Sequence, residues 1–417
     1  MYLIKRNLLK ELESHLSKKE ISLIIGPRQV GKTTLMKVLL DKLKREGKKT
    51  VYLNLDFESD RKFFNSQEAL IQKIRLEVGN EGYVFIDEIQ RKENAGIFLK
   101  GIYDMDLPYK FAVSGSGSLE LKEKIHESLT GRKRIFELYP VSFVEFVNFR
   151  TGYKYESNIN DFFYLEQEKV FYFLKEYLNF GGYPAVILVD EKKEKTIVID
   201  EIYQSYLEKD ISFFLKVEKI DAFSELIKIL SSQIGKIVNF SNICSSLNIS
   251  VQTLKNYLYY AEKTFIIRRL TPYFKNIKKE ISKSPIFYFY DLGLRNYVLS
   301  LFGNIEGINQ NGFLFQNFIF NILTEKIRYT GARIHFWRTK EKAEVDFVIN
   351  TGREVIPIEV KYKKFSKPSI ERSFRSFIRK YNPKKGFIIN LNFEHKMRIE
   401  DTEISFLPFW KLINFKF

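Results

Sequence analysis

Short apolar runs alternate with segments of helical periodicity over the first 120 residues of the chain. The apolar runs have the length of buried strands and cover residues 21–25, 50–55, 83–86 and 110–113. Helix-like spacing of apolar residues occurs at residues 1–20, 35–43, 69–78 and 94–106. Strands that alternate with helices are typical of a parallel sheet covered on both faces, so this part of the chain is predicted to be an α/β domain.

The pattern becomes mainly helical over residues 160–220 and is interrupted at Gly181-Gly182-Tyr183-Pro184, a turn-forming sequence. Residues 240–247 then predict a short helix, and Ser250 is placed to cap a second helix after a two-residue turn. Two predicted strands follow, at residues 267–273 and 286–290. This order of elements is typical of a winged helix-turn-helix, which either enters a DNA groove or serves as a packing module.

The residues after the first predicted strand match a phosphate-binding loop, because they satisfy G-x-x-x-x-G-K-[ST] between a strand and a helix. Glycines in such a loop let backbone N–H groups turn toward phosphate oxygens, and the helix N-terminus adds partial positive charge. Lys32 is expected to reach the β- and γ-phosphates, and the Thr33 hydroxyl is expected to ligate Mg²⁺. The predicted nucleotide contacts are Gly26, Pro27, Arg28, Gln29, Val30, Gly31, Lys32, Thr33 and Thr34.

Two carboxylates follow the apolar run at residues 83–86, at the strand end where open α/β sheets bind their ligands. Asp87 is predicted to hold Mg²⁺ through water, and Glu88 is predicted to polarise the attacking water. Together the two motifs predict a chain that binds a nucleoside triphosphate.

A serine- and glycine-rich stretch, Ser114-Gly115-Ser116-Gly117-Ser118, comes after the run at residues 110–113. A polar side chain at the end of this strand can contact the γ-phosphate or the attacking water, and Ser114 is the preferred candidate. The alternative is a flexible loop without a chemical role.

The composition adds a strong positive charge to this picture. The 417 residues contain 68 Lys and Arg against 51 Asp and Glu, a formal net charge of +17. Nucleic acid is the first partner that such a charge indicates, while an anionic membrane surface or a general lysine-rich composition are alternatives. Cys244 is the only cysteine, and there is no signal peptide pattern or long apolar run. We therefore expect a cytoplasmic protein without a membrane span.

Several motifs together resemble one group of AAA+ ATPases found in archaea and bacteria: GPRQVGKTT, FIDEIQ, SGS, LTGR, LYPVSFVEF and SPIFYFYDLGLRN. The resemblance covers essentially the whole chain. It implies ATP as the nucleotide, a helical lid, a winged helix and a C-terminal nuclease-like domain. It also implies a homo-oligomer, a ring in the resembled group, in which Arg132, or else Arg134, completes the ATP site of a neighbouring subunit. The alternative for Arg132 is an ordinary surface arginine.

The C-terminal part has the order of elements of the PD-(D/E)XK nuclease fold, with a helix at residues 312–323 followed by strands. Asp346 and Glu359 are expected on adjacent strands, where they could share a divalent metal, and Lys361 could position a water. The helix carries Gln316 where the resembled family usually has glutamate. An amide brings no negative charge, so we favour a nuclease-like fold kept for DNA binding or packing over an active nuclease.

Ten basic residues against a single acid lie between Lys361 and Lys385, with aromatic residues between them. Arg372, Arg375 and Arg379 have the spacing of one helical face and predict a stripe that follows DNA phosphates. A solvated helix face is the alternative. The predicted DNA contacts are Lys255, Lys363, Lys364, Arg372, Arg375 and Arg379.

The sequence thus predicts an α/β multidomain protein with a P-loop AAA+ parallel sheet, a helical lid, a winged helix-turn-helix and a restriction-endonuclease-like α/β domain. The expected domains are 1–155, 156–220, 221–304 and 305–417. The predicted function is ATP hydrolysis coupled to binding and remodelling of DNA, with branched or junction DNA as one substrate. A regulatory NTPase switch that acts on a protein partner is the main alternative, and an ATP-regulated nuclease is the third.

Overall fold

The computed structural model describes residues 3–116, 129–214, 219–274, 283–305 and 311–413. Contacts divide the chain into two compact units, each of which is built from several segments. The first unit comprises residues 1–149, 182–221 and 256–266. The second unit comprises residues 150–181, 222–255 and 267–417. This grouping is coarser than the four domains expected from the sequence, and those four domains stay a prediction.

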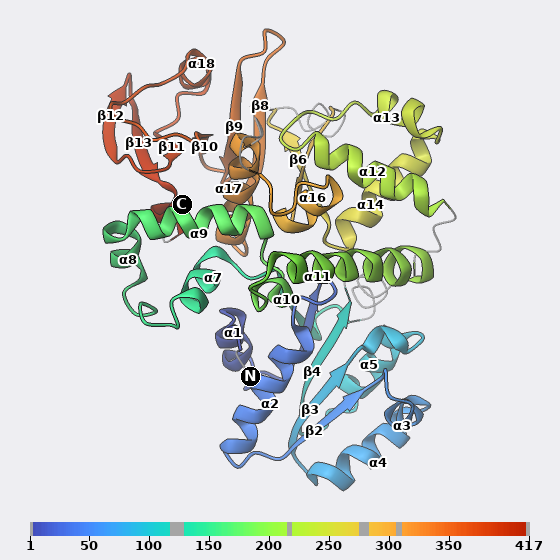
Figure 1. Ribbon diagram of the computed structural model, residues 1–417. Coiled ribbons are helices and arrows are strands. Elements are labelled where there is room, and N and C mark those ends of the chain that lie inside the picture. Colours follow the sequence, from blue (N-terminus) through green and yellow to red (C-terminus); the bar gives the residue numbers. More distant parts are fainter. Residues whose placement is uncertain (1–2, 117–128, 215–218, 275–282, 306–310, 414–417) are drawn as a thin grey trace. The chain divides into compact units, whose positions relative to one another are not determined.

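A five-stranded parallel sheet forms the centre of the first unit (Figure 1) and has the strand order β2-β3-β4-β1-β5. The strands are β1 Ile21–Gly26, β2 Thr50–Asn54, β3 Gly82–Asp87, β4 Tyr109–Ser116 and β5 Lys133–Glu137. The predicted parallel α/β sheet is confirmed. The predicted end of the fourth strand was wrong, because β4 continues through Ser114 to Ser116. Gly117 and Ser118 lie outside the described residues.

Helices cover both faces of this sheet, with α1 and α2 on one face and α4 and α5 on the other (Figure 1). The helical elements up to α5 are α1 Leu8–Ser14, α2 Lys32–Arg45, α3 Glu58–Arg61, η1 Lys62–Phe64, α4 Gln67–Val78, η2 Ile89–Arg91 and α5 Ala95–Asp104. Later in the chain come α7 Phe143–Arg150, α10 Pro184–Ile187, α11 Lys192–Ser205 and the π-helix η3 Tyr206–Phe214.

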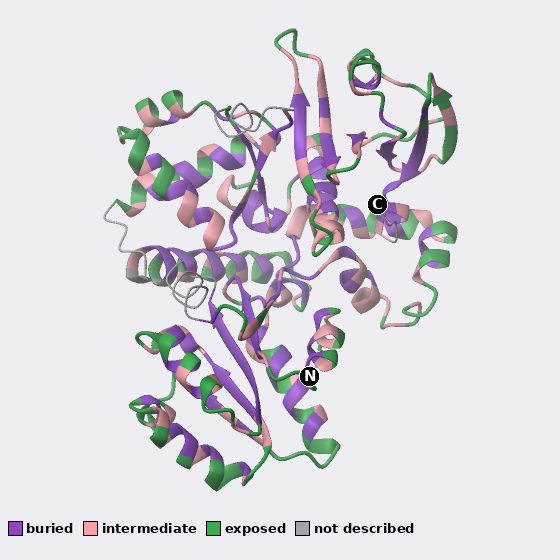
Figure 2. Cartoon of the chain, turned by 180° about the vertical axis from the view of Figure 1, so that it is seen from behind, coloured by how far each residue is buried: buried purple, intermediate pink, exposed green. Residues whose placement is uncertain are grey.

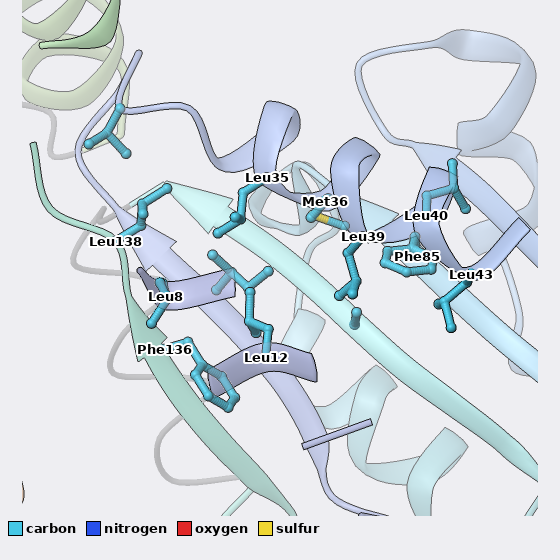
Figure 3. Packing of buried hydrophobic residues seen from close by; sticks show 13 residues of the cluster. Leu8, Leu12, Leu35, Met36, Leu39, Leu40, Leu43, Phe85, Phe136 and Leu138 are labelled. Atoms are coloured by element: carbon cyan, nitrogen blue, oxygen red, sulfur yellow. The ribbon is translucent and has the colours of Figure 1, made fainter. Parts of the chain in front are cut away.

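One hydrophobic cluster fixes α2 against the sheet (Figure 3). Leu35, Leu39 and Leu43 follow one face of the helix and are at most 3% exposed. They pack with residues of α1 and with Phe85 and Phe136 from the strands. Burial of each such leucine side chain stabilises the fold by about 1.5–3 kcal/mol, so the loop that precedes α2 is attached to a rigid helix. Figure 2 shows the same buried character along the strands of the sheet.

The second unit contains an eight-stranded mixed sheet with the order β12-β13-β11-β10-β9-β8-β6-β7. Its strands are β6 Ile267–Pro272, β7 Ile286–Phe289, β8 Arg333–Arg338, β9 Glu344–Asn350, β10 Val355–Val360, β11 Lys385–Asn390, β12 His395–Ile399 and β13 Thr402–Pro408. The sequence pattern predicted β6 and β7 as a separate wing. Instead, β6 pairs with β7 on one side and with β8 on the other, so these strands continue the C-terminal sheet.

The helices of the second unit include the first helix of the predicted helix-turn-helix. They are α8 Ile159–Leu165, α9 Gln167–Phe180, α12 Ile220–Ser232, α13 Phe240–Leu247, α16 Leu292–Val298, α17 Asn311–Ile327, α18 Arg372–Tyr381 and α19 Phe409–Ile413. Helix α14 Val251–Lys263 passes from the second unit into the first. The Ser250 hydroxyl accepts from the Thr253 N–H at 3.0 Å, which is the predicted cap. Within the described part of the chain, every helix is too short or too polar to cross a membrane.

Candidate active site

The loop between β1 and α2 adopts a conformation that depends on its two glycines. Gly31 has a φ of 96°, a left-handed conformation that residues with a Cβ atom rarely adopt. Gly26 lies directly against the backbone carbonyl of Leu138, so a side chain there would collide with the residue that follows β5. The Arg6 guanidinium donates to the Val30 carbonyl at 3.0 Å and ties the loop to the N-terminal segment.

Lys32 begins α2 and is only 6% exposed. Its ammonium group donates to the carbonyl oxygens of Gly26 at 3.0 Å and Pro27 at 2.8 Å. Burial lowers the pKa of Lys32, whereas the negative charges of Glu88 and Asp210 act in the opposite direction. The ammonium group is therefore held at the centre of the loop, where a phosphate chain would meet it.

Asp87 is fully buried at the end of β3 and collects hydroxyl groups from three elements. Thr33 of α2 and Tyr52 of β2 each donate to Asp87 Oδ2 at 2.6 Å. Ser114 of β4 donates to Asp87 Oδ1. Because β4 lies between β1 and β3 in the sheet, the loop after β1 and the carboxylate after β3 meet across it. Hydroxyl and carboxylate oxygens are the ligands that Mg²⁺ prefers, so Thr33 and Asp87 fit a magnesium ion.

Glu88 follows Asp87 in a left-handed conformation, with a φ of 58°. Its backbone N–H faces the Ser114 hydroxyl at 3.4 Å, and its carboxylate accepts from the Gln90 side-chain amide. The Gln90 side-chain oxygen in turn accepts from the Ser116 N–H at 3.1 Å. The strained backbone of Glu88 and the Gln90 bridge together orient this carboxylate toward β4. A contact of Ser114 with phosphate or water stays a prediction.

Three residues of this site were missed by the sequence reasoning: Tyr52, Gln90 and Asp210. Burial and the hydrogen bond to Asp87 raise the pKa of the Tyr52 hydroxyl, which keeps it a donor. Gln90 stands two residues after Glu88 in the recognised FIDEIQ motif, and that proximity was an available signal. Asp210 is 182 positions from its partner Arg28, and no local pattern indicates that contact.

Arg132 lies at the end of the same sheet where β1 and β5 begin. It immediately precedes β5, and its carbonyl accepts from the Ile21 N–H at 2.9 Å, at the start of β1. The Arg132 guanidinium donates to both carboxylate oxygens of Asp104, at 2.6 and 3.3 Å. The phosphate-binding loop lies at the opposite end of β1, so Arg132 does not contribute to the site of its own chain.

The second predicted site, formed by Asp346, Glu359 and Lys361, lies in the second unit. Each of these side chains makes a hydrogen bond or an ion pair with another residue of that unit. Gln316 of α17 donates to Asp346 Oδ1 at 2.6 Å, and the Val360 N–H donates to Oδ2 at 2.7 Å. Lys361 Nζ lies 2.8 Å from Glu359 Oε1 and 2.6 Å from the Glu371 carboxylate. Burial and the charge of Glu359 raise the pKa of Asp346.

Both carboxylates of this site are paired within the chain. An amide N–H faces Asp346 and an ammonium group faces Glu359, whereas Glu359 Oε2 and Gln316 Oε1 are buried without a hydrogen-bond partner among the described residues. In addition, no group of three or more His, Cys, Asp or Glu side chains suited to a metal occurs among the described residues. We therefore derive no metal-dependent cleavage from this site.

The predicted basic stripe lies on a helix, as expected. Arg372 and Arg379 on α18 are exposed, and Arg375 is partly buried. Arg379 also pairs with Glu400 at 3.5 Å. Phe374 and Phe377 on the same helix belong to a buried hydrophobic cluster. These two aromatic residues therefore anchor the helix to the sheet.

The remaining predicted DNA contacts, Lys255, Lys363 and Lys364, are exposed. The ammonium group of Lys363 lies 5.6 Å from the ring centre of Phe365, and that of Lys364 lies 4.6 Å from that of Phe171. Both lysines thus rest on aromatic rings while they face solvent.

Comparison with known families assigns the part of the chain that carries the nucleotide motifs. A family model described as an AAA domain matches residues 18–147. Two models described as domains of unknown function match residues 172–304 (DUF8612) and 311–412 (DUF4143). The match agrees with the parallel sheet and the loop geometry, so this segment is similar to an AAA domain and carries the sequence motif of a P-loop.

Similar proteins extend over nearly the whole chain. An uncharacterized protein of Methanocaldococcus jannaschii is 26% identical and aligns with 96% of this chain and 90% of its own length. An uncharacterized protein of Mycobacterium tuberculosis is 25% identical over 97% of this chain and 84% of its own. A third, from Haemophilus influenzae, is 24% identical over 98% of both chains.

Solved structures align more weakly. The Orc1 protein of Aeropyrum pernix in complex with DNA aligns with 70% of this chain and 91% of its own, at 11% identity and a TM-score of 0.28. The replication initiator DnaA, bound to AMPPCP and single-stranded DNA, aligns with 63% of this chain and 90% of its own. Its identity is 16% and its TM-score 0.31. These scores are too low to establish a common fold.

Proposed function

We propose that this protein is a magnesium-dependent ATPase that binds DNA and uses ATP hydrolysis to remodel it. The observation that carries the ATPase part is the contact of Thr33 with Asp87, which joins the phosphate-binding loop and the acidic strand in one site. Lys32 would bind the β- and γ-phosphates, and Thr33 and Asp87 would hold the magnesium ion. The ion would supply positive charge for the phosphate oxygens when bound.

Glu88 is the proposed general base of this reaction. Its carboxylate is held by Gln90, which is itself bound to β4 through the Ser116 N–H. A carboxylate fixed in this way can accept a hydrogen bond from water and orient it for attack on the γ-phosphate. Tyr52 and Ser114 keep Asp87 in place through their hydroxyl groups.

Arg132 is the proposed arginine finger for a neighbouring copy, which makes the active form a homo-oligomer, a ring in our proposal. The position of Arg132 before β5 supports this role, since it lies away from the phosphate-binding loop of its own chain. Asp104 holds the guanidinium in place through two hydrogen bonds. Such an arginine typically accelerates hydrolysis by about 10³–10⁵-fold.

Two basic surfaces support DNA as the partner, one on each unit. The first is the α18 stripe, formed by Arg372, Arg375 and Arg379, and the same unit also exposes Lys363 and Lys364. The second is a hollow of about 880 Å³ at the start of the parallel strands, and its lining includes Lys18, Lys19, Lys48, Lys49 and Lys110. Clusters of this kind attract the phosphate backbone and give a salt-dependent affinity.

ATP hydrolysis by the purified protein, measured with and without Mg²⁺, tests the ATPase proposal. Lys32→Ala should reduce the rate at least 100-fold, because the phosphates lose their main cation. Lys44→Ala is the matched control, since Lys44 is an exposed lysine on the same helix. Equal rates for Lys32→Ala and the wild type would refute the proposal.

A further inference from the structure

The phosphate-binding loop carries a second cation besides Lys32. Arg28 lies between the two glycines of the loop, and its Nε donates to Asp210 Oδ2 at 2.9 Å. The Asp210 side chain is 5% exposed and that of Arg28 is 15% exposed, so water screens this ion pair weakly. Asp210 belongs to η3, which is far from the loop in sequence but lies in the same compact unit.

The element that carries Asp210 is itself unusual. Helix η3 is a π-helix over Tyr206–Phe214, and such helices are rare and frequently occur at functional sites. The Tyr206 hydroxyl lies 2.5 Å from that of Thr264, and this contact fixes the start of η3 within the unit. The position of Asp210 is therefore set by a distorted helix with an anchored N-terminal end.

Asp210 is also incompletely satisfied. Its Oδ1 atom is buried and has no hydrogen-bond partner within the described residues. Burial raises the pKa of this carboxyl, while the charges of Arg28 and Lys32 oppose that effect. A buried carboxylate with one unpaired oxygen costs free energy, and replacing such a pair by apolar residues is often neutral or stabilising. Stability alone is thus a weak reason for this pair.

The electrostatic neighbours of the pair are residues of the active site. Asp210 interacts with the charges of both Lys32 and Glu88. Lys32 in turn interacts with the charges of Arg28, Asp210, Glu88 and Asp87. The Arg28–Asp210 pair therefore lies at the predicted phosphate-binding loop, within electrostatic reach of Lys32 and Glu88.

We propose that Arg28 and Asp210 form a γ-phosphate sensor, in which Asp210 holds the guanidinium until a triphosphate takes it over. This inference rests on the proposed nucleotide site. The planar guanidinium can bind two phosphate oxygens through two parallel hydrogen bonds. A triphosphate offers these oxygens on its γ-phosphate, whereas a diphosphate ends one phosphate earlier and lacks them. Transfer of the guanidinium to the γ-phosphate releases Asp210. Helix η3 is therefore held by the loop when ADP is bound and is released from it when ATP is bound.

The sensor makes opposite predictions for its two members. Arg28→Ala removes the cation, so binding of a non-hydrolysable ATP analogue with Mg²⁺ should weaken about tenfold or more, because a charge-assisted hydrogen bond is lost. ADP binding should change by less than about threefold, because the lost partner is the γ-phosphate. Asp210→Asn removes the competing carboxylate, so the analogue should bind more tightly by about three- to tenfold relative to ADP.

Isothermal titration calorimetry with the analogue and with ADP measures both dissociation constants for each variant of the full chain. The double variant should resemble Arg28→Ala, since Asp210 acts through Arg28. Arg28→Lys keeps the charge without the planar fork and should recover only part of the selectivity. Circular dichroism spectra establish whether each variant is folded. If Arg28→Ala does not fold, Asp210→Asn and Arg28→Lys are sufficient to test the sensor.

The matched control is Glu145→Gln. Glu145 also forms a buried ion pair with an arginine, Arg6, at 3.3 Å, and that arginine also contacts the loop through the Val30 carbonyl. If this variant loosens the loop in general, the dissociation constants of the analogue and of ADP should therefore change by the same factor. An unchanged ratio of ADP to analogue dissociation constants in Arg28→Ala and Asp210→Asn would overturn the sensor. Absence of nucleotide binding by the wild type would instead overturn the proposed function.

Discussion

The Thr33 hydroxyl and the Asp87 carboxylate lie 2.6 Å apart, although 54 positions separate the two residues in the chain. Thr33 is fixed by the first turn of α2, and Asp87 by the end of β3. Their contact exists because β1 and β3 are both neighbours of β4 in the parallel sheet. The loop proposed to bind phosphates and the strand that carries the acidic pair thus form a single candidate site.

Glu88→Gln should separate nucleotide binding from hydrolysis. The amide keeps the size of the side chain but cannot accept a proton, so the hydrolysis rate should fall at least about 100-fold. The dissociation constant of Mg·ATP should change by less than about threefold, because Glu88 is not expected to bind the phosphates. Single-turnover hydrolysis and calorimetry measure the two quantities, with Glu93→Gln as an exposed control. Normal turnover would remove Glu88 from the mechanism.

Gln90 should act as a positioning residue. Gln90→Leu removes the bridge between the Glu88 carboxylate and the Ser116 N–H. The value of kcat should fall about tenfold while KM stays close to that of the wild type, because only the orientation of the base is lost. A change confined to KM would contradict this role and indicate that Gln90 contacts the nucleotide.

Tyr52→Phe should destabilise the first unit. The substitution removes one of the two hydroxyl groups that donate to Asp87 Oδ2, an oxygen of a fully buried carboxylate. Loss of a hydrogen bond to a charged group costs about 1.5–3 kcal/mol. Urea unfolding measures the change, and Tyr172→Phe, at a residue 67% exposed, is the control. If the free energy of unfolding is unaffected, the Tyr52 hydroxyl does not stabilise Asp87.

The salt dependence of DNA binding distinguishes the two basic surfaces. If the α18 stripe contacts phosphates, changing Arg372, Arg375 and Arg379 to Ala should reduce the slope of log K against log salt by about 2–3. The matched triple variant in the first unit is Lys18→Ala, Lys48→Ala and Lys49→Ala, at the lysine-lined hollow. Fluorescence anisotropy over a salt series gives both slopes. Whichever surface leaves the slope unchanged is not in contact with DNA.

Stability should fall as the pH drops through the range in which His15 titrates. Burial, followed by the charges of Lys110 and Arg134, lowers the pKa of His15 from 6.5 to about 4. The unfolded chain therefore binds a proton between these values that the folded chain does not, so the loss of stability grows as the pH falls from about 6.5 to about 4.

Urea midpoints at pH 7.5 and pH 5 test this expectation. The wild type should lose more stability between the two pH values than His15→Gln, because glutamine carries no titrating group. His15 accepts a hydrogen bond from Lys110 at 3.2 Å in the neutral form, and glutamine can also accept one. Equal losses for the two proteins would show that His15 does not control the acid sensitivity.

Sequence reasoning located the parts of the active site that lie in short, continuous motifs. Lys32, Thr33, Asp87 and Glu88 could be predicted because their chemistry depends on a strand end and a helix start nearby. The role of Tyr52 could not be predicted, since it depends on which strand pairs with β3. The same applies to Asp210, whose contact with Arg28 depends on the packing of η3.

The errors have similar causes. The sequence pattern predicted the positions of β6 and β7 correctly. It could not predict that β6 also pairs with β8, because the local sequence does not determine which distant strands pair. The spacing of the arginines on α18 predicted their common face, whereas it gave no position for the aromatic residues between them. Phe374 and Phe377 are buried there because a helix on a sheet needs an apolar face.

The central claim is that ATP hydrolysis at the Lys32–Asp87 site is coupled to DNA. The most direct test is the steady-state ATPase rate with duplex, single-stranded or four-way-junction DNA, at low and high salt. The account predicts that at least one form of DNA stimulates hydrolysis by the wild type and that high salt abolishes the effect. An ATPase rate that no DNA changes, together with tight retention of ADP, would contradict it and indicate a regulatory switch that acts on a protein partner.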